Sequence, residues 1–299
     1  MALIPYDDRD GWIWFDGKLI PWREAQLHVC THALHYASCV FEGERVYDGV
    51  TFKLREHTER LLKSAQILGY EIPYTADQID RACEEVIKAQ NIQDGYLRPV
   101  AWRGSEMMGV SAQQSKIHLA IASWEWPAYF TPEARLRGIR MQISKWRRPA
   151  PDTAPTEAKA AGLYMICTLS KHKAEADGFN DALMFDYRGR VAEATGANIF
   201  FVKDGNLHTP EADCFLNGVT RKTVIQLAKK RGITVIERAI WPQELPTFDE
   251  VFLSGTAVEV TPVREIDTMN FQVGSVTRTL LADFDKLVRE KPASKSAAE

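Results

Sequence analysis

The chain has 299 residues, of which 45% are hydrophobic and 26% are charged, and its formal net charge is −3. This composition is typical of a soluble globular protein with one large domain or two ordinary ones. The small net charge gives no electrostatic basis for capturing nucleic acid or an anionic membrane.

The cysteines are scattered, without a C-x-x-C pair or any other paired spacing: Cys30, Cys39, Cys83, Cys167 and Cys214. Such usage predicts reduced thiols in a cytoplasmic protein and favours neither a disulfide framework nor a metal site. The first residues lack the basic and apolar regions of a signal peptide, and no apolar stretch approaches the roughly 20 residues that span a bilayer. We therefore expect a soluble, cytoplasmic protein.

The first half of the chain predicts short strands with two helices. Asp16-Gly17 and Asp48-Gly49 supply the tight turns of two expected hairpins, over 12–20 and 40–54. Apolar residues at helical spacing predict helices over 57–69 and 75–91, the second opening with Thr75 and Gln78 in capping-box spacing. Further strands are expected at about 96–103, 116–124 and 137–144.

Prolines interrupt this pattern in the segment WRRPAPDTAPT, residues 146–156. Because proline fixes φ and lacks an N–H donor, neither a helix nor a central strand fits there. The segment therefore predicts an interdomain linker at 146–156. It would join a smaller N-terminal domain, 1–145, to a larger C-terminal domain, 157–290.

Strands and helices alternate again in the second half. Helices are expected at 163–177, 218–232 and 275–289, and strands at 181–186, 190–194, 198–203, 206–209, 233–240 and 249–257. The final residues, 291–299, are small and polar and predict a disordered tail. The expected fold class is α+β in two domains.

Lys159 lies among small residues in the stretch PTEAKAAGLYM. Burial of an amine lowers its pKa, and a neutral amine can condense with an aldehyde. Small neighbours would also let a flat cofactor approach the amine closely. Taken alone, the pattern favours a surface lysine after a proline-rich loop.

Glu193 stands among small residues in EATGAN, directly before an apolar strand. A carboxylate in this position could hold a proton on the ring nitrogen of pyridoxal phosphate, which then acts as an electron sink. The alternative is a polar turn residue without a catalytic role.

Two turns rich in small residues, NGVTRKT (217–223) and SGTAVE (254–259), could together bind a phosphate group. Helix N-terminal N–H groups and the hydroxyls of Thr220 and Thr256 would supply donors, and Arg60 could add positive charge. Each turn could also be structural capping alone. The glycine patterns of the P-loop and of dinucleotide-binding folds are absent from the sequence. An amine, a ring-nitrogen partner and a phosphate cup together indicate a pyridoxal phosphate enzyme.

These residues resemble the class IV pyridoxal phosphate aminotransferases, and most closely the bacterial branched-chain amino acid aminotransferases. The similarity runs from about Trp12 to Leu287, over the segments HALHYASCVFEGERVY, REHTERL, YLRP, EAKAAGLY, EATGANIFFVKDG, NGVTRKTV and SGTAVEVTPV. The resemblance implies the two-domain fold of this family and pyridoxal 5′-phosphate as cofactor. It also implies transamination of leucine, isoleucine and valine with 2-oxoglutarate by a ping-pong mechanism.

The resemblance further implies roles for single residues. Lys159 would bond covalently to the cofactor, Glu193 would pair with its ring nitrogen, and Tyr164 would contact its phenolic oxygen. The phosphate cup is implied at Arg60, Val219, Thr220 and Thr256, with Leu216 against the ring face. Substrate contacts are implied at Tyr96, Thr256 and Ala257 for the α-carboxylate, at Phe41, Gly43, Trp126 and Tyr129 for the apolar pocket, and at Arg45 and Arg98 on its rim. Tyr36 and Val110 would reach in from a second subunit, and the family is at least dimeric because its active site is shared across that interface.

Two departures from the family pattern concern specificity more than reaction class. Glu44 stands beside Arg45, where an apolar residue is common, and its carboxylate could pair with Arg45 or face solvent; the sequence favours solvent. Ala194 and Thr195 replace part of a commoner EGxGxN form and could alter the local turn.

Other functions stay open on sequence alone. D-amino acid aminotransferases, (R)-amine aminotransferases and aminodeoxychorismate lyases share the family's lysine, although YLRP together with FEGER favours the branched-chain reaction. A Schiff-base aldolase using Lys159 directly would leave Glu193 and the phosphate cup unexplained. In a non-catalytic binding module, the glycines and threonines would serve turn geometry only.

Overall fold

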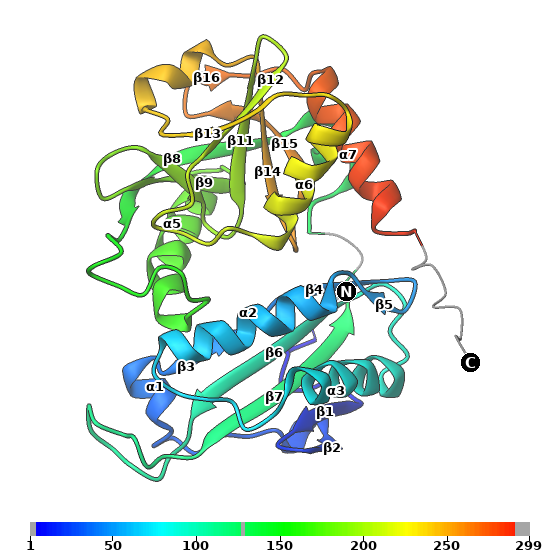
Figure 1. Cartoon of the computed structure of the whole chain (residues 1–299), viewed down its shortest axis with the longest axis vertical. Coiled ribbons are helices and arrows are strands. Elements are labelled where there is room, and N and C mark those ends of the chain that lie inside the picture. Colours follow the sequence, from blue (N-terminus) through cyan, green and yellow to red (C-terminus); the bar gives the residue numbers. More distant parts are fainter. Residues whose placement is uncertain (1–3, 127–128, 291–299) are drawn as a thin grey trace.

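The computed structural model describes residues 4–126 and 129–290, so the tail predicted at 291–299 lies outside the described residues. Within them, the strands form two sheets, one from each half of the chain, and Figure 1 shows the two resulting parts one above the other. Helices accompany both sheets. This arrangement confirms the expected α+β fold in two parts.

The first part is an antiparallel sheet with the strand order β2-β1-β7-β6-β4-β5, and β3 also pairs with β6. Its elements are β1 (Trp12–Phe15), β2 (Lys18–Pro21), a 3-10 turn (Trp22–Glu24), α1 (His32–Tyr36), β3 (Cys39–Phe41), β4 (Glu44–Tyr47), β5 (Val50–Thr51), α2 (Leu54–Ile67), α3 (Ala76–Ala89), β6 (Gly95–Arg103) and β7 (Ile117–Glu125). Leu61 of α2 and Val86 of α3 pack with Leu97 and Leu119 of the sheet. The two helices therefore share one buried core with it.

Local sequence signals are confirmed in this part. Asp16 and Asp48 have φ of +47° and +50°, and each is followed by a glycine with positive φ, as the tight hairpin turns require. Thr75 and Gln78 form the expected capping box at the start of α3. The helix predicted from residue 57 begins earlier, at Leu54.

The second part contains a closed ring of strands. Its order is β10-β9-β8-β15-β14-β11, and β10 also pairs with β11, which closes the ring; β12 and β13 extend it beyond β11, and β16 pairs with β15. Its elements are α4 (Pro132–Arg137), β8 (Ile139–Arg148), a 3-10 turn (Ala161–Tyr164), α5 (Met165–Ala176), β9 (Asp181–Asp186), β10 (Val191–Ala194), β11 (Asn198–Lys203), β12 (Asn206–Pro210), α6 (Val219–Lys230), β13 (Val235–Arg238), a 3-10 turn (Pro242–Thr247), β14 (Glu250–Gly255), β15 (Glu259–Ile266), β16 (Met269–Asn270) and α7 (Ser275–Leu287).

Successive side chains of β11 pack into two separate hydrophobic cores, on opposite faces of the strand. Ile199 and Phe201 pack in one cluster with residues of β8, β9, β14 and β15. Phe200 and Val202 belong to the other cluster, which includes residues of α6 and α7. Since successive strand residues point to opposite faces, one strand serves both cores.

The structure corrects the expected position of the linker. Strand β8, assigned from the sequence to the N-terminal domain and its linker, pairs with β9 and β15 of the second sheet. The proline-rich residues therefore connect two elements of the second part, β8 and α5. The chain passes between the sheets earlier, after β7 and before β8, and we propose that the domain boundary lies there, within residues 126–138.

Strand β15, which contains Pro262, was not predicted from the sequence. A proline is rare inside a central strand, because it cannot donate to the ladder. Pro262 pairs with Phe252 of β14, but the ladder with β8 begins only at Val263, so the proline lies outside the second ladder.

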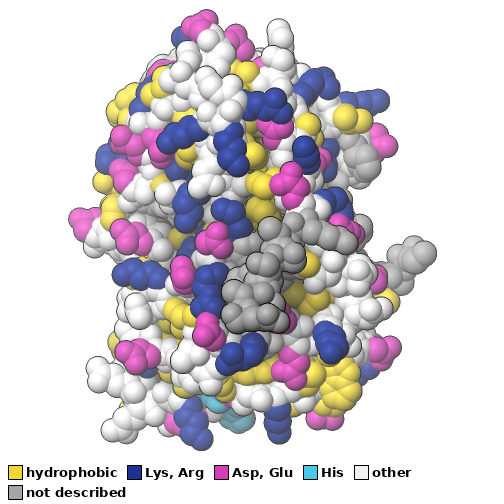
Figure 2. All heavy atoms as spheres, turned by 45° about the vertical axis from the view of Figure 1, so that its right-hand side comes forward, with side chains coloured by type: hydrophobic (Ala, Val, Ile, Leu, Met, Phe, Trp, Pro, Cys, Tyr) yellow, Lys and Arg dark blue, Asp and Glu magenta, His cyan; other side chains and the backbone are white. Residues whose placement is uncertain are grey.

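Acidic and basic side chains intermingle over the face drawn in Figure 2, with apolar side chains between them. This mixture agrees with the small net charge of the chain. None of the helices in the described ranges has both the length and the apolar character that crossing a bilayer requires.

Candidate active site

A cavity between the two parts collects most of the residues expected around a cofactor. From the expected set, it is lined by Gly43, Arg60, Tyr96, Lys159, Tyr164, Glu193, Leu216, Val219, Thr220, Thr256 and Ala257. These residues come from both sheets, from α2, α6 and from the segment before α5. The sequence signals therefore converge on one place in space.

Lys159 is anchored to the first part by its backbone, although it belongs to the second half of the chain. The Phe41 N–H donates to the Lys159 carbonyl at 3.1 Å, and the Lys159 N–H donates to Ser64 Oγ of α2 at 3.0 Å. Buried Ala158 and Ala160 flank it. The lysine thus stands at the junction of the two parts, with little bulk beside it.

The amine of Lys159 has the environment of a reactive lysine. Its Nζ donates a hydrogen bond to Tyr164 Oη at 2.6 Å and lies 4.9 Å from the centre of the Phe41 ring. Burial, together with the positive charge of Arg60, lowers the pKa of Lys159 from 10.5 to about 8. About a tenth of the amine is therefore neutral and nucleophilic at pH 7, far more than in an ordinary lysine.

Glu193 lies on β10, buried at the floor of the cavity. Its Oε1 is 3.3 Å from Arg148 Nε, and its Oε2 accepts a hydrogen bond from Asn198 Nδ2 at 3.2 Å. Burial raises the pKa of Glu193 to about 7, against the opposing charges of Arg148 and Lys159. A carboxyl group with this pKa can share a proton with a weakly basic ring nitrogen.

Tyr164 keeps its proton in this site. Burial, reinforced by Glu193 and Cys167, raises the pKa of its hydroxyl well above the ordinary value. Its ring packs edge-on against Phe41, with the ring centres 4.9 Å apart. The hydroxyl is therefore a fixed polar contact for both Lys159 and anything bound beside it.

The N-terminus of α6 opens onto the cavity. Gly218 is its N-cap and makes no side-chain cap, and the following Val219 and Thr220 are buried and line the cavity. Uncapped N–H groups at the start of a helix attract anions, and the helix dipole reinforces the attraction. Thr256, after β14, and Arg60, on α2, line the same cavity. This donor set fits a phosphate group.

The remaining expected substrate residues lie around this cavity or on the surface. The Arg98 guanidinium lies over the rings of Phe41 and Tyr96, 4.7 and 5.4 Å from their centres. Trp126 is 5.2 Å from the Tyr96 ring and stacks on Tyr129 at 6.1 Å.

Arg45, Tyr36 and Val110, like Phe41, Arg98, Trp126 and Tyr129, are not among the residues that line the cavity. Arg45 is buried, and its NH2 group is 4.0 Å from Glu259 Oε1. Tyr36 and Val110 are 43% and 88% exposed on this chain. Their expected contribution from a second subunit stays a prediction.

Two residues at Glu193 were missed by the sequence analysis. Arg148 is buried at the end of β8, directly before the prolines, where it was read as part of a linker. Asn198 donates to Glu193 and to the Leu216 carbonyl and accepts from the Gly218 N–H, so it ties β11 to the start of α6. Asn198 follows Glu193 by only five residues, and this closeness in sequence could have indicated that the two side chains meet.

Glu44 is buried in the core of the first part, so its expected exposure to solvent was wrong. Successive strand residues point to opposite faces, and Glu44 shares the core face of β4 with Val46, away from Arg45. Neither carboxyl oxygen has a hydrogen-bond partner among the described residues. Burial, with repulsion from Glu42, raises its pKa well above the ordinary value.

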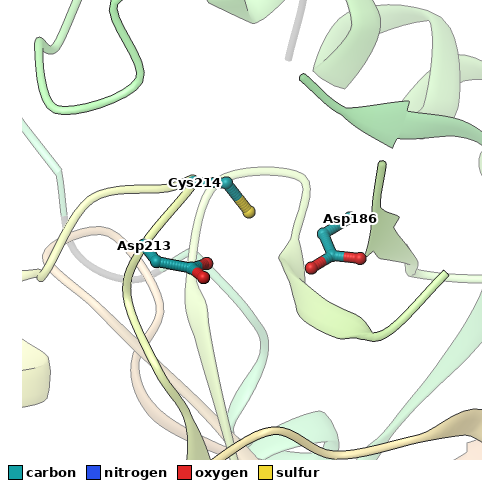
Figure 3. A group of neighbouring side chains, drawn as sticks. All are labelled: Asp186, Asp213 and Cys214. Carbon is teal, nitrogen blue, oxygen red and sulfur yellow. The ribbon is translucent and has the colours of Figure 1, made fainter. Parts of the chain in front are cut away.

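Asp186, Asp213 and Cys214 come together outside the cavity, and Figure 3 shows their side chains facing one another. Their carboxylates are already shared by two guanidinium groups. Arg190 donates to both aspartates at 2.8 Å, and Arg188 also bonds to both. The cluster is an ion-pair network that fixes the turn between β9 and β10, and we assign no metal to it.

Comparison with known proteins agrees with this geometry. The sequence model described as amino-transferase class IV matches residues 39–266. A probable branched-chain-amino-acid aminotransferase of Rickettsia felis is 42% identical over 97% of this chain and 100% of its own length. The branched-chain-amino-acid aminotransferase of Pseudomonas aeruginosa is 42% identical over 95% of both chains.

Solved structures of this kind superpose over nearly the whole chain. The crystal structure of the Escherichia coli branched-chain amino acid aminotransferase gives a TM-score of 0.92 at 38% identity, covering 97% of this chain and 98% of that one. The branched-chain amino acid aminotransferase of Thermobaculum terrenum, solved in its PLP-form, gives 0.85 at 30% identity, covering 93% of each chain. The chain therefore belongs to the class IV aminotransferase family.

Proposed function

We propose that this protein is a branched-chain amino acid aminotransferase that uses pyridoxal 5′-phosphate and transfers amino groups from leucine, isoleucine or valine to 2-oxoglutarate. The observation that carries the proposal is the cavity at Lys159, where an amine of lowered pKa, a buried acid and an anion site converge. The two relatives named above match nearly the whole of this chain, and their names describe branched-chain-amino-acid aminotransferases.

The cavity residues fit the parts of the cofactor. Arg60, Thr220, Thr256 and the N–H groups at the start of α6 would hold the phosphate, and Leu216 would pack against the ring. Glu193 would hold a proton at the ring nitrogen, with Arg148 and Asn198 fixing its carboxylate. Bound pyridoxal phosphate supplies an aldehyde for the amino group and a ring that takes up electrons.

Lys159 would act twice, as the amine that holds the cofactor and as the base that moves a proton from the substrate Cα. Its lowered pKa suits the second task, because a neutral amine is ready to accept that proton. The Tyr164 hydroxyl, 2.6 Å from Nζ, would keep the amine in place as it moves protons.

Substrate specificity would depend on two regions of the site. Tyr96, Thr256 and Ala257 would take the α-carboxylate, and Phe41, Gly43, Trp126 and Tyr129 would enclose an aliphatic side chain. Arg98 would offer its guanidinium group to the second carboxylate of 2-oxoglutarate. Arg45 faces Glu259 and does not line the cavity, so we assign it no substrate contact. We further propose a homodimer or larger homo-oligomer in which Tyr36 and Val110 complete the site of the neighbouring subunit.

Initial rates with L-leucine, D-alanine and an aromatic (R)-amine, each with a 2-oxo acid acceptor and added pyridoxal phosphate, test the proposal. L-leucine should be the best of the three donors with 2-oxoglutarate. A preference for D-alanine or the (R)-amine would assign the chain to another branch of the family. Pyruvate release from aminodeoxychorismate, without turnover of L-leucine, would indicate a lyase.

A further inference from the structure

The turn between β14 and β15 has a glutamate at a left-handed backbone position where glycine is usual. The two strands pair as far as Gly255 and Glu259, which leaves residues 256–258 as a three-residue loop. Glu259 then takes the left-handed conformation, with φ of +54°. Such loops favour glycine at the left-handed position, because a Cβ strains the backbone there. A glutamate in that place needs a compensating role for its side chain.

The carboxylate of Glu259 is bound by side chains from other elements. Tyr47 Oη donates to Oε1 at 2.8 Å, and Arg135 NH2 lies 3.4 Å from Oε2. Arg45 NH2 is 4.0 Å from Oε1, and Arg135 also donates to Asp285 of α7 at 2.8 Å. The Glu259 side chain is only 12% exposed, so solvent screens these contacts weakly.

These contacts join the two parts of the molecule. Tyr47 and Arg45 lie on β4 of the first sheet, Arg135 lies on α4, between β7 and β8 in the chain, and Glu259 begins β15 of the second sheet. Burial, with the nearby Glu259 charge, raises the pKa of the Tyr47 hydroxyl well above its ordinary value. Tyr47 is therefore a permanent donor in this contact.

Both chain segments that meet at Glu259 also contribute neighbouring residues to the cavity wall. Thr256 and Ala257, in the loop just before Glu259, line the cavity, and Gly255 lines it as well. On the opposite side Gly43, two residues before Arg45, also lines it. A movement of Glu259 would therefore move the loop that faces the bound substrate.

We propose that Glu259 is a positioning residue, whose carboxylate, held by Tyr47 and Arg135, fixes the 256–258 loop so that Thr256 and Ala257 meet the substrate α-carboxylate. This inference rests on the proposed function, which assigns Thr256 and Ala257 to that carboxylate. It also explains the glutamate in a left-handed position, since the contact between the two parts offsets the local strain.

Two variants test the inference by steady-state kinetics at saturating pyridoxal phosphate. Glu259→Gly removes the carboxylate but suits the left-handed backbone, so the loop can still form. Tyr47→Phe removes one hydrogen bond and leaves the charge and the ring in place. We expect KM for L-leucine to rise about tenfold in Glu259→Gly and about threefold to tenfold in Tyr47→Phe. The kcat should stay within about twofold, because binding would weaken equally in ground and transition states.

Matched variants control for backbone and charge effects. Asp204→Gly places a glycine at another left-handed position, in the exposed turn between β11 and β12, and should leave KM unchanged. Glu265→Gln removes a carboxylate from the far end of the same strand, where it pairs with Arg140, and should also leave KM unchanged. A rise in KM in either control equal to that in Glu259→Gly would overturn the inference.

Double variants separate this inference from the site assignment. Tyr47→Phe should add nothing in a Glu259→Gly background, and Glu259→Gly should add little in a Thr256→Ala background. If Thr256→Ala leaves KM at the native value, the assignment of Thr256 is wrong. If Thr256→Ala raises KM but Tyr47→Phe and Glu259→Gly do not, only the positioning role is wrong. Should Glu259→Gly fail to fold, Tyr47→Phe decides, because it keeps the carboxylate.

Discussion

The amine of Lys159 lies 2.6 Å from the hydroxyl of Tyr164, five residues further along the chain. The 3-10 turn at Ala161–Tyr164 brings the two side chains to the same side of the segment. This pairing places a polar, protonated contact beside the amine on which the proposed chemistry depends. Three expected outcomes follow from the surroundings of the cavity and a fourth from the buried acid Glu44, beside the kinetic test of Glu259.

Replacing Lys159 by alanine should abolish transamination while the fold survives. Ala158 and Ala160 already occupy the flanking positions, so a small side chain fits, and no other amine is expected to replace the base. We expect a loss of about a thousandfold or more in kcat with L-leucine, measured by release of glutamate. Lys173→Ala, at an exposed lysine of α5, is the control. Near-native turnover by Lys159→Ala would refute the assigned role.

The chemical reactivity of Lys159 should follow its lowered pKa. Because the pKa falls from 10.5 to about 8, the neutral amine appears at lower pH than in an ordinary lysine. In protein freed of cofactor, modification of Lys159 by trinitrobenzenesulfonate should reach half its maximal rate near pH 8. Peptide mass spectrometry measures the modification of every lysine in one digest, so the exposed lysines serve as the internal reference for Lys159. A midpoint near 10.5 would contradict the burial of the amine.

Glu193→Gln should retain the cofactor but lose most activity. The amide has nearly the same shape and can still contact Asn198, but it cannot carry the negative charge that stabilises a proton on the ring nitrogen. We expect kcat to fall by about a hundredfold or more, with bound cofactor followed by its visible absorbance. Glu211→Gln, at an exposed carboxylate, should leave both quantities unchanged. Undiminished turnover in Glu193→Gln would remove Glu193 from the mechanism.

Glu44→Ile should stabilise the protein. A buried acid without a partner among the described residues costs about 1–3 kcal/mol in free energy of unfolding, which an apolar side chain avoids. Since the folded pKa of Glu44 is raised, its contribution is most favourable below the unfolded value of 4.5 and is lost as pH rises above it. Urea unfolding at pH 5 and pH 8 should therefore show the larger gain at pH 8. A lower stability of Glu44→Ile at both pH values would show that the carboxyl has a structural partner.

Short-range signals were sufficient for much of the fold. Asp-Gly pairs fix a hairpin turn within four residues, and the Thr75–Gln78 capping box is equally local, so both were predictable. The pairing of β8 with β15 joins segments more than a hundred residues apart, and no local pattern encodes it. The misplaced domain boundary has the same cause, because the prolines mark a turn but not the sheet to which its flanks belong.

The candidate site shows the same division. Lys159 and Glu193 could be selected because small neighbours surround each of them in the sequence. Arg148 reaches Glu193 because β9 pairs with both β8 and β10, so nothing near residue 148 indicated it. Glu44 was expected to face solvent because it is charged, whereas the pleat of β4 turns it to the core face, away from Arg45.

The single rung that joins β10 to β11 pairs Glu193 with Asn198, and it is also the rung that completes the circle of strands. The acid expected at the ring nitrogen therefore also takes part in closing the barrel. An insertion in the turn at residues 195–197 that broke the β10–β11 pairing would open the barrel and displace the Glu193 carboxylate at the same time. Loss of barrel closure and loss of proton control at the cofactor should be inseparable defects in this protein.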